Sequence, residues 1–368
     1  MTGGSGFVGK NLQEFIVKEL EGEYRKASAI IIDTISTVTS SFQSLYFKAG
    51  ETEYELCAPS SRQLNILDEE SVYEWLGSVR FNIVLHFAVY TDAVDKNKDG
   101  SKILDYNLRS FMIFYKYRKF YGRLFYSGSG AEFDKNYDIL QAKEHMLEDP
   151  DEVNGAVLNG SDTMQLVPTD AYGLMKYTCG RLIEQSENVY NVRIFGLFGK
   201  YEYRFRFITE MVLRSIEGRP FEVNQNVYFD YLWVDDFCRM LLMLVSKKNL
   251  KYHSYNLVSG ERVTLRQICD MVNEAAMEYR ESHLERLSEE EKTRPFTGPG
   301  FEDGRITLEQ RLERLLCQPV IFKEEGLNNE YTGSNERILE ELGEFEYTPL
   351  QEAIDSLYGW YAHSEYGL

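Results

Sequence analysis

The fold is decided by Thr2-Gly-Gly-Ser-Gly-Phe-Val-Gly9 near the start of the chain and by Ala171-Tyr-Gly-Leu-Met-Lys176 in its middle. In the first stretch, Gly3, Gly6 and Gly9 follow a Gly-x-x-Gly-x-x-Gly spacing. Such a turn lets the backbone approach a pyrophosphate, whose charge the following helix N-terminus favours. In the second stretch, Tyr172 and Lys176 stand about one helical turn apart and would share a helix face. Together the two stretches predict redox chemistry on an alcohol or ketone.

Apolar patterns before residue 199 alternate between strands and helices. Helices are predicted at 7–20, 72–76, 103–120 and around the Tyr172–Lys176 pair, and strands at 29–32, 54–58, 64–68, 81–88, 123–127 and 192–195. This alternation predicts an α/β fold with a doubly wound, Rossmann-like parallel sheet.

Beyond residue 199 the pattern loosens. Helices are predicted at 207–217, 235–245 and from 265, and strands at 228–233 and 255–260. The charge-rich stretch 278–314 is interpreted as a solvated helical excursion. We expect a dinucleotide-binding domain of residues 1–198 plus about 229–262. A smaller C-terminal α/β substrate lobe would comprise about 199–228 plus 263–368.

Composition narrows the functional classes. The formal charge is −19 over 368 residues, so nucleic acids and anionic membranes are poor partners. No apolar run is long enough to span a bilayer, and no signal peptide precedes the glycines, which predicts a soluble cytoplasmic protein. The five scattered cysteines predict neither disulfides nor a metal site, and are expected to be small buried side chains.

The beginning of the chain leaves a question, because a dinucleotide fold needs a strand before the glycine loop and only Met1 and Thr2 precede it here. Either that strand is missing or another segment fills its place, with 29–32 as a candidate. The second strand of the fold decides the cofactor. If it is 54–58, the following Ser60, Ser61 and Arg62 can donate to a 2′-phosphate, which favours NADP. If it is 29–32, Asp33 would accept ribose hydroxyls, which favours NAD.

Tyr172 is the candidate proton donor and acceptor. A free tyrosine has a pKa of about 10, and the ammonium of Lys176 beside a bound oxidised nicotinamide would lower it. Lys176 could also hold the nicotinamide ribose. Ser129, after the predicted strand 123–127, could hydrogen-bond and orient the substrate oxygen.

In these segments the chain resembles the extended short-chain dehydrogenases/reductases of the NAD-dependent epimerase/dehydratase family. Besides the two stretches quoted above, the matching pieces are Leu85-His-Phe-Ala88, Tyr106-Asn107, Ser127-Gly-Ser-Gly-Ala131, Arg193-Ile-Phe195, Tyr231-Leu-Trp-Val-Asp-Asp236, Tyr255-Asn-Leu-Val-Ser-Gly260 and residues 343–361. Within the family, residues 58–68 are most similar to the GDP-fucose synthase branch. That branch supports 54–58 as the second strand, and hence NADP with NAD possible, leaving residues 24–52 as an insertion.

The resemblance implies roles by position. It implies a catalytic trio of Ser129, Tyr172 and Lys176. It also implies that further residues line the cofactor, in addition to the glycines and to Ser60, Ser61 and Arg62. These are Phe7, Val8, Asp68, Phe87, Ala88, Asn107 and Phe195. Each of these also has a purely structural explanation: Asp68 could end a strand, and His86 beside Phe87 is expected to be a hydrogen-bonded strand-end residue. Asp235 and Asp236 are expected to cap a helix.

Four positions depart from the family pattern, and they narrow the reactions that we expect on the substrate. The family often has asparagine at the position of Gly196 and an arginine that binds pyrophosphate at that of Phe229. The cysteine and histidine that invert sugar carbons in GDP-fucose synthases correspond to Ala131 and Tyr201. A double epimerisation is therefore disfavoured. Tyr201, Arg204 and Arg206 are the candidate substrate residues, and the two arginines could neutralise a phosphate.

The sequence thus predicts an NAD(P)-dependent oxidoreductase or epimerase acting on a nucleotide-linked sugar. The alternative is a non-catalytic dinucleotide-binding sensor or scaffold. A homodimer through the helices near 103–120 and 172–185 is a further expectation.

Overall fold

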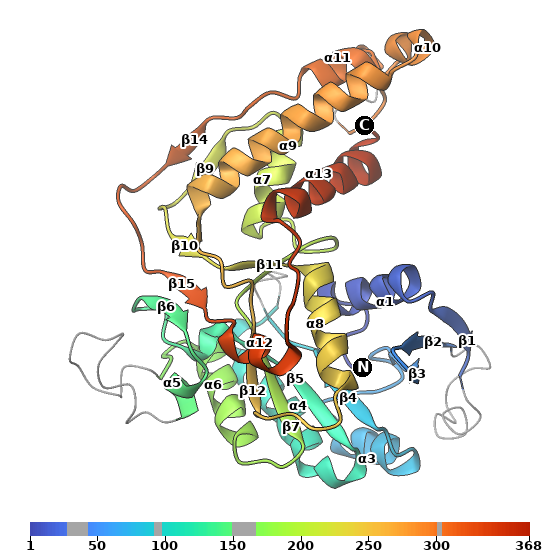
Figure 1. Ribbon diagram of the computed structural model, residues 1–368, viewed down its shortest axis with the longest axis vertical. Coiled ribbons are helices and arrows are strands. Elements are labelled where there is room, and N and C mark those ends of the chain that lie inside the picture. Colours follow the sequence, from blue (N-terminus) through green and yellow to red (C-terminus); the bar gives the residue numbers. More distant parts are fainter. Residues whose placement is uncertain (28–42, 92–97, 149–166, 300–303) are drawn as a thin grey trace.

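The computed structural model describes residues 1–27, 43–91, 98–148, 167–299 and 304–368 (Figure 1). The lower half of the view contains a sheet whose strands are β4 (Ile83–His86), β5 (Arg123–Ser129), β7 (Val189–Ile194) and β12 (Ser254–Leu257). They follow the order β12-β7-β5-β4, and every pairing is parallel. Short strands with this pairing place all their carboxyl ends at one edge, where a ligand is expected.

Both faces of this sheet are covered by helices. Along β5, Leu124 and Tyr126 enter one apolar core while Phe125 enters the other, as the alternation of a strand requires. The first of these cores lies under α3 (Glu69–Ser78), α4 (Ile103–Lys116) and α6 (Ala171–Ile183), and the second under α1 (Phe7–Glu19) and α8 (Val234–Ser246). The predicted doubly wound parallel sheet is confirmed.

The place of the strand before the glycine loop is taken by Met1 and Thr2 themselves. Thr2 forms a parallel bridge with His86, and its backbone nitrogen donates to the Leu85 oxygen at 2.9 Å. The sequence-based candidate for this place, 29–32, lies outside the described residues, as does Asp33. A single bridge is enough because the Thr2 hydroxyl adds contacts to the ring of His86, at 2.9 Å, and to the nitrogen of Ala88, at 3.2 Å.

An antiparallel meander flanks this position. It consists of β1 (Glu23–Lys26), β2 (Gln43–Ala49) and β3 (Thr52–Leu56), in that order. The Met1 nitrogen donates to the oxygen of Cys57, directly after β3, at 2.5 Å. The strand predicted at 54–58 is therefore present as β3, beside the Met1–Thr2 segment, and β1 and β2 belong to the predicted insertion.

The strand predicted at 64–68 is wrong, because this segment consists of turns that lead into α3. The Leu64 nitrogen donates to the Ser60 oxygen at 3.0 Å, and the Asn65 side chain accepts from the Leu67 nitrogen at 3.1 Å. Asp68 then caps α3 by accepting from the Glu70 nitrogen at 3.2 Å. Short polar side chains thus bind the amides that a neighbouring strand would otherwise use.

Two predicted elements divide in the structure. The strand predicted at 228–233 is β10 (Tyr228–Phe229) and β11 (Tyr231–Trp233), which belong to different sheets. Asp230 breaks the strand, since its buried carboxylate accepts from the Ser259 and Gly260 nitrogens, each at 2.9 Å. The helix predicted at 103–120 ends as α4 at Lys116, and a 3₁₀ turn, η2 (Arg118–Phe120), follows it.

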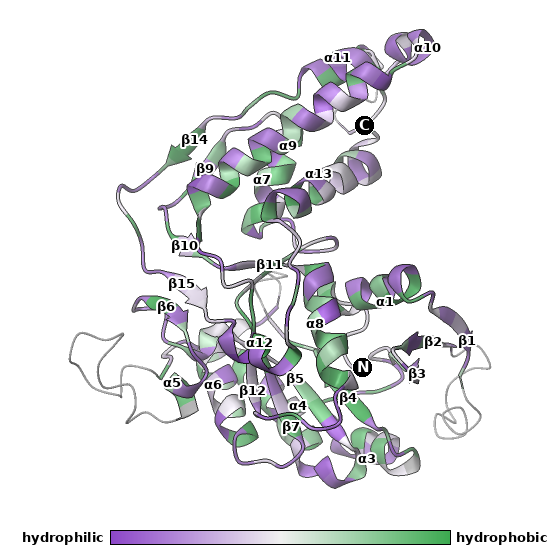
Figure 2. Ribbon diagram, in the orientation of Figure 1, coloured by the Kyte–Doolittle hydropathy of each residue, from purple (hydrophilic) through white to green (hydrophobic). Residues whose placement is uncertain are grey.

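The upper half of Figure 1 is formed mainly by later parts of the chain. Its elements are α7 (Phe207–Ile216), β9 (Phe221–Val223), α9 (Leu265–Arg286), α10 (Glu289–Thr293), α11 (Leu308–Glu313), β14 (Val320–Phe322) and α13 (Leu350–Tyr366). The far end of α9 and α10 are coloured mostly as hydrophilic in Figure 2, which fits the predicted solvated helical excursion.

The remaining described elements are short. They are η1 (Gly100–Lys102), η3 (Gly130–Glu132), β6 (Ile139–Ala142), α5 (His145–Glu148), β8 (Gly196–Phe198), β13 (Val263–Thr264), β15 (Tyr331–Gly333) and α12 (Glu336–Leu342). The chain passes repeatedly between the halves, and one apolar core contains both Leu12 of α1 and Leu357 of α13. The predicted boundaries of the two domains stay a prediction.

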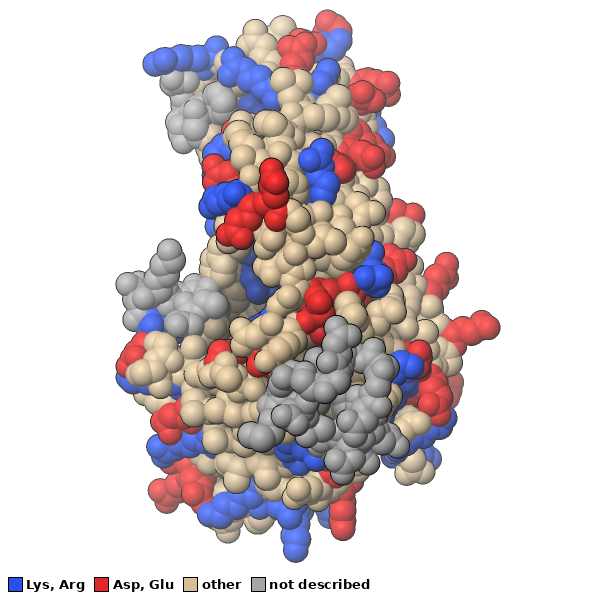
Figure 3. Space-filling model, turned by 90° about the vertical axis from the view of Figure 1, so that its left-hand side faces the viewer, with Lys and Arg blue, Asp and Glu red and all other residues tan. Residues whose placement is uncertain are grey.

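The surface carries mixed charges. On the face shown in Figure 3, acidic and basic side chains are interspersed, without one extended basic field. Among the described residues, no helix is both long and apolar enough to cross a membrane. Within the same part of the chain no group of His, Cys, Asp and Glu is arranged to hold a metal ion. Four cysteines are buried as expected, whereas Cys317 is exposed.

Candidate active site

The glycine loop turns tightly between Thr2 and α1. Gly3 has φ +78°, and a Cβ there would lie 2.9 Å from the Ala88 nitrogen. A Cβ on Gly9 would lie 2.3 Å from the Gly3 oxygen, so only glycine fits where the loop and α1 meet. Gly6 caps α1 without a side-chain acceptor, so the first amides of this helix, at Phe7 and Val8, are available to an anion.

The segment after β3 lies directly against this loop. A Cβ on Gly4 would lie 2.8 Å from the Cβ of Ala58. Ser60, Ser61 and Arg62 follow Ala58 on the exposed surface. This arrangement puts two hydroxyls and a guanidinium near the candidate pyrophosphate loop. Asp68 is farther along the chain and is engaged as the cap of α3.

The remaining candidate cofactor residues lie after β4 and β7. Phe87 is buried against Phe237, and Ala88 contacts the glycine loop. Asn107 is buried on α4. Its side-chain amide accepts from the Tyr90 nitrogen and donates to the Tyr90 oxygen, each at 2.7 Å, and so fixes the segment that follows β4. Phe195 is buried directly after β7. These contacts are structural, and the cofactor roles of these residues stay predictions.

Tyr172 and Lys176 share a face of α6, one turn apart. Asp170 begins this helix by accepting from the Gly173 nitrogen at 2.8 Å. The Lys176 nitrogen lies 5.6 Å from the centroid of the Tyr172 ring, and it donates to the Ser127 oxygen at the end of β5. The ammonium is 1% exposed. Lys176 therefore connects the helix that carries the phenol to the strand that carries Ser129.

Ser129 is the last residue of β5 and the cap of η3. Its hydroxyl accepts from the Ala131 nitrogen at 3.1 Å, while its own nitrogen donates to Glu132 at 3.1 Å. The turn packs against α6, because a Cβ on Gly173 would lie 2.7 Å from the Ala131 oxygen. Ser129 and the Tyr172–Lys176 pair are thus brought together by a direct contact between η3 and α6.

Sequence reasoning missed Tyr331. This residue lies on β15, and its phenol interacts with the Ser129 hydroxyl and with Tyr172, while burial raises its pKa well above the usual range. Its ring packs against Phe195 at 5.1 Å and Phe229 at 5.6 Å between centroids. No motif surrounds Tyr331 in the sequence, so only the fold reveals it. Glu132, in contrast, stands in a Ser-x-x-Glu capping-box pattern that the sequence does contain.

The three candidate substrate residues diverge. The Arg206 guanidinium contacts Glu202 at 3.4 Å, and its charge lowers the pKa of Tyr231 and Tyr331 against the larger effect of their burial. Arg204 instead bonds Glu365 on α13, away from that group. The Tyr201 hydroxyl donates to Glu14 on α1 at 2.9 Å. Arg204 and Tyr201 are thus bonded to acidic side chains of α13 and α1, and the substrate role of all three residues stays a prediction.

Aromatic rings cluster beside the turn that follows Ser129, where a Cβ on Gly130 would lie 2.5 Å from both the Phe195 ring and the Tyr331 hydroxyl. Phe229 stacks on Tyr231 with centroids 5.4 Å apart, and Tyr331 joins Phe229 to Phe195. Phe229 stands where the sequence resemblance leads one to expect an arginine. The rings present flat apolar faces of the kind that sugars and bases bind.

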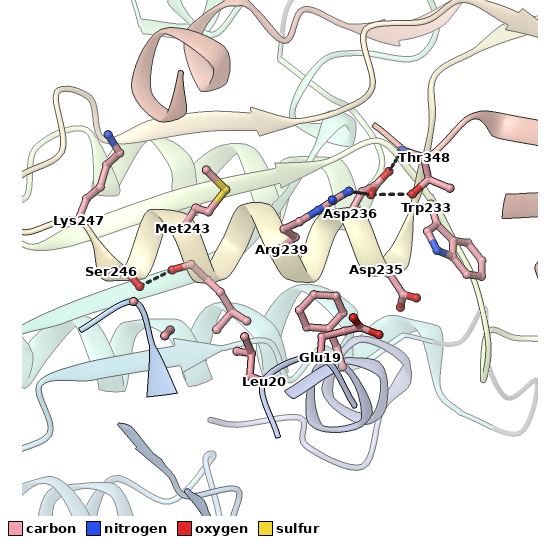
Figure 4. Close-up of a pocket in the computed structure, with 14 residues that line it drawn as sticks. Glu19, Leu20, Trp233, Asp235, Asp236, Arg239, Met243, Ser246, Lys247 and Thr348 are labelled. Atoms are coloured by element: carbon pink, nitrogen blue, oxygen red, sulfur yellow. Dashed lines mark hydrogen bonds and ion pairs between the residues drawn. The ribbon is translucent and has the colours of Figure 1, made fainter. Parts of the chain in front are cut away.

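A groove of about 680 Å³ lies elsewhere, between α1 and α8 (Figure 4). Its floor is apolar, with Leu20 and Met243, and none of the candidate site residues lines it. Asp236 closes one end by accepting from the Thr348 nitrogen at 2.9 Å. Asp235 and Asp236 were expected to cap α8, but the helix begins after Trp233 without a side-chain cap, and Asp236 ties its first turn to the segment before α13.

Comparison with known proteins shows the family of the chain. The model of the NAD dependent epimerase/dehydratase family matches residues 1–257. The chain belongs to this family. A curated family relative, the dTDP-D-glucose 4,6-dehydratase of Dictyostelium discoideum, is 20% identical over 262 residues, which are 67% of this chain and 55% of that protein. The chain thus spans about half the length of the curated relative it matches.

Solved structures share the family's fold with this chain. A GDP-L-fucose synthetase from Naegleria fowleri is 14% identical, with a TM-score of 0.64. The match covers 99% of this chain and 92% of the synthetase chain. The UDP-glucose 4-epimerase of Thermotoga maritima, solved with UDP-glucose, has a TM-score of 0.61 at 14% identity and covers 99% and 98%. A Bacillus anthracis dTDP-glucose 4,6-dehydratase in complex with NAD has a TM-score of 0.60 at 13% identity and covers 99% and 96%. The predicted family and fold class are confirmed.

Proposed function

We propose that this protein is an NAD(P)-dependent oxidoreductase or epimerase that acts on a nucleotide-linked sugar. The observation that carries the proposal is the contact between η3 and α6, which joins Ser129 to the Tyr172–Lys176 pair at the sheet edge where the glycine loop also follows Thr2. Solved relatives include proteins described with UDP-glucose, NAD or NADP, which supports a sugar nucleotide and a nicotinamide cofactor here.

The chain's own residues suit a proton transfer at one substrate oxygen. Tyr172 would deprotonate an alcohol, or protonate the oxygen of a ketone, and Lys176 would stabilise the phenolate by its positive charge. The Ser129 hydroxyl accepts from the Ala131 nitrogen, and its proton, which interacts with the Tyr331 phenol in the structure, would donate to the substrate oxygen instead. A bound nicotinamide would supply hydride transfer at the neighbouring carbon.

The residues fit such a cofactor. Only glycine fits at Gly3 and Gly9, and the uncapped start of α1 can receive the pyrophosphate. We propose NADP, with NAD possible, because Ser60, Ser61 and Arg62 lie beside this loop and offer donors to a 2′-phosphate.

The substrate part of the proposal rests on the aromatic cluster around Tyr331. Phe229 and Tyr231 offer ring faces to a sugar or base, and Arg206, whose side chain is half-exposed, is the candidate contact for a phosphate. Ala131 and Tyr201 replace the expected epimerising cysteine and histidine, so a single hydride transfer or a C4 epimerisation is the proposed outcome.

The test is turnover of a panel of sugar nucleotides by the purified protein, with 4-keto members supplied with NADPH or NADH and 4-hydroxy members supplied with NADP or NAD. Loss of the reduced-nicotinamide absorbance at about 340 nm with a 4-keto member indicates a reductase, and conversion of a 4-hydroxy member to its C4 epimer without net change of the cofactor indicates an epimerase. Tyr172→Phe should lower turnover roughly 10²–10⁴-fold, because the proton donor is lost.

Cofactor binding serves as the control for this variant. Tyr172→Phe keeps the ring and its packing, so NADPH affinity measured by fluorescence should stay nearly unchanged. Wild-type protein that binds NADPH but turns over none of the panel would favour the sensor or scaffold alternative, and a fully active Tyr172→Phe would exclude the proposed mechanism.

A further inference from the structure

A buried carboxylate lies directly beneath the Ser129 turn. Glu132 ends η3, and its side chain folds back under Ser129 with 1% of its surface exposed. One carboxylate oxygen accepts from the Ser129 nitrogen at 3.1 Å and from the Asn191 amide at 3.0 Å. The other accepts from the Arg193 Nε at 2.7 Å and from the same amide at 3.1 Å. Both oxygens are therefore fully bonded inside the protein.

The charge of Glu132 is balanced by an equally buried partner. Arg193 lies on β7 and is also 1% exposed. In the sheet it stands opposite Gly128, the residue before Ser129. The ion pair thus ties the end of β5, the turn after it and the neighbouring strand into one unit.

Two glycines make room for this arrangement. A Cβ on Gly128 would lie 1.9 Å from the Asn191 Oδ1 and 2.6 Å from Glu132 Oε1. A Cβ on Gly180 of α6 would lie 2.6 Å from Glu132 Oε2. Gly180 follows Gly173 by seven residues, so both face η3 from the same side of the helix. Glycine weakens a helix interior, and here its absent side chain lets α6 approach the carboxylate.

The position of Ser129 relative to Tyr172 is set at this contact. Tyr172 is adjacent to Gly173, which meets the Ala131 oxygen, and Gly180 meets Glu132 two turns later. Glu132 holds the nitrogen of Ser129 at one end of the turn, and the Ala131 nitrogen holds the Ser129 hydroxyl. A displaced carboxylate would release the turn at the residue that is proposed to contact the substrate.

We propose that Glu132, held by Arg193, is a positioning residue that fixes the Ser129 turn against α6 so that the serine hydroxyl and the Tyr172 phenol reach the same substrate oxygen. This inference rests on the proposed function of that site. Glu132 touches neither the substrate nor the cofactor, and it acts through the backbone of Ser129. Its removal should therefore lower kcat and leave the KM for NADPH unchanged.

The experiment uses a single and a double variant of the full chain. Glu132→Gln keeps the shape but leaves the charge of Arg193 unpaired in the interior, and it should lower kcat at least tenfold. Glu132→Leu with Arg193→Met removes both charges, so no buried ion is left alone and folding is retained. This pair should show the same fall in kcat with an unchanged KM for NADPH and an unchanged melting temperature.

Glu341 provides the matched control. Its carboxylate is also buried, accepting from the Tyr255 hydroxyl at 2.7 Å and the Lys251 nitrogen at 2.9 Å, but it lies at the amino end of β12 rather than at the carboxyl end of β5. Glu341→Gln should lower the melting temperature and leave kcat unchanged, which separates positioning from general stability.

Two results would overturn the inference. One is a folded double variant with the kcat of the wild type. The other is a crystal structure of the double variant in which the Ser129 turn has not moved from α6, a measurement that needs no activity. Failure of the wild type to turn over any sugar nucleotide would instead count against the proposed function, and the crystal structure would still test the role of Glu132.

Discussion

His86 connects three segments through one ring. Nδ1 contacts the Thr2 hydroxyl at 2.9 Å, and Nε2 contacts the Ser110 hydroxyl at 3.2 Å. The ring also packs on Phe114 with centroids 4.6 Å apart. Burial, followed by the nearby charge of Lys176, lowers the pKa of His86 to about 3, so the ring is neutral in the folded protein. The expectation of a hydrogen-bonded strand-end residue is confirmed.

From the lowered pKa of His86 we predict how the free energy of unfolding depends on pH. Its folded pKa is about 3 against an ordinary value of 6.5, so the unfolded chain binds the proton first. The stability that the neutral ring provides is complete above about pH 6.5, and it falls as the pH drops toward 3, by up to about 1.4 kcal/mol per pH unit. Urea unfolding of wild type and His86→Gln between pH 8 and pH 4 measures this effect.

The comparison between the two proteins isolates His86 from the carboxylates, which titrate in both. His86→Gln should be less stable at pH 8 and should lose less stability on acidification than the wild type. Parallel losses in the two proteins would show that His86 does not titrate as described.

Residues that act within one segment could be predicted from the sequence, and those that act across segments could not. The Tyr172–Lys176 pair is one helical turn, so its geometry follows from spacing alone. Tyr331 reaches Ser129 from β15, about two hundred residues later in the chain. Arg204 and Arg206 are close in sequence, but only the fold shows that the first bonds Glu365 of α13 and the second Glu202.

Among the elements, α6 requires a glycine at position 180, although alanine normally stabilises the interior of a helix. Gly180→Ala should destabilise the protein by about 1–3 kcal/mol, because the new Cβ would lie 2.6 Å from Glu132 Oε2 and the buried contact must open. This loss should exceed the gain of about 1 kcal/mol that alanine offers to a helix. Chemical unfolding measures the difference.

Gly77 of α3 is the matched control, since a Cβ there would meet only Phe120, at an ordinary 3.7 Å. Gly77→Ala should therefore stabilise the protein by about 0.5–1 kcal/mol. If Gly180→Ala were equally stabilising, α6 would not be packed against η3 as closely as described.

Element boundaries could be predicted where apolar periodicity is strong and failed where polar side chains intervene. α1 and α8 follow their predicted ranges within two residues at each end. At 64–68 the apolar pattern suggested a strand, but Asn65 and Asp68 take up backbone amides and form turns instead. Asp230 likewise divides a predicted strand between two sheets by accepting three hydrogen bonds from Ser259 and Gly260.

At the scale of the whole molecule, we propose that two copies associate through α4 and α6. Exposed residues on α4 recur at helical spacing and include Asp105, Arg109, Met112 and Lys116. Light scattering should then give a mass of about twice 42.9 kDa. Met112→Glu, at a side chain that is 40% exposed, should shift the protein toward the monomer by placing a charge in an apolar contact.

Leu316 is the control for the dimer, because it is similarly exposed but lies after α11 in the upper half. Leu316→Glu should leave the mass unchanged. A monomeric wild type, or equal effects of the two substitutions, would argue against α4 and α6 as the interface.

The pairing of β12 with β7 has a consequence for synthesis on the ribosome. The sheet receives its last strand about sixty residues after β7 has emerged, once the chain has visited the upper half of the molecule. At a translation rate of roughly 5–20 residues per second, one edge of the nascent sheet stays unpaired for about 3–12 s. That edge carries Val189, Tyr190 and Val192, so β7 is the strand whose exposure a chaperone would have to cover.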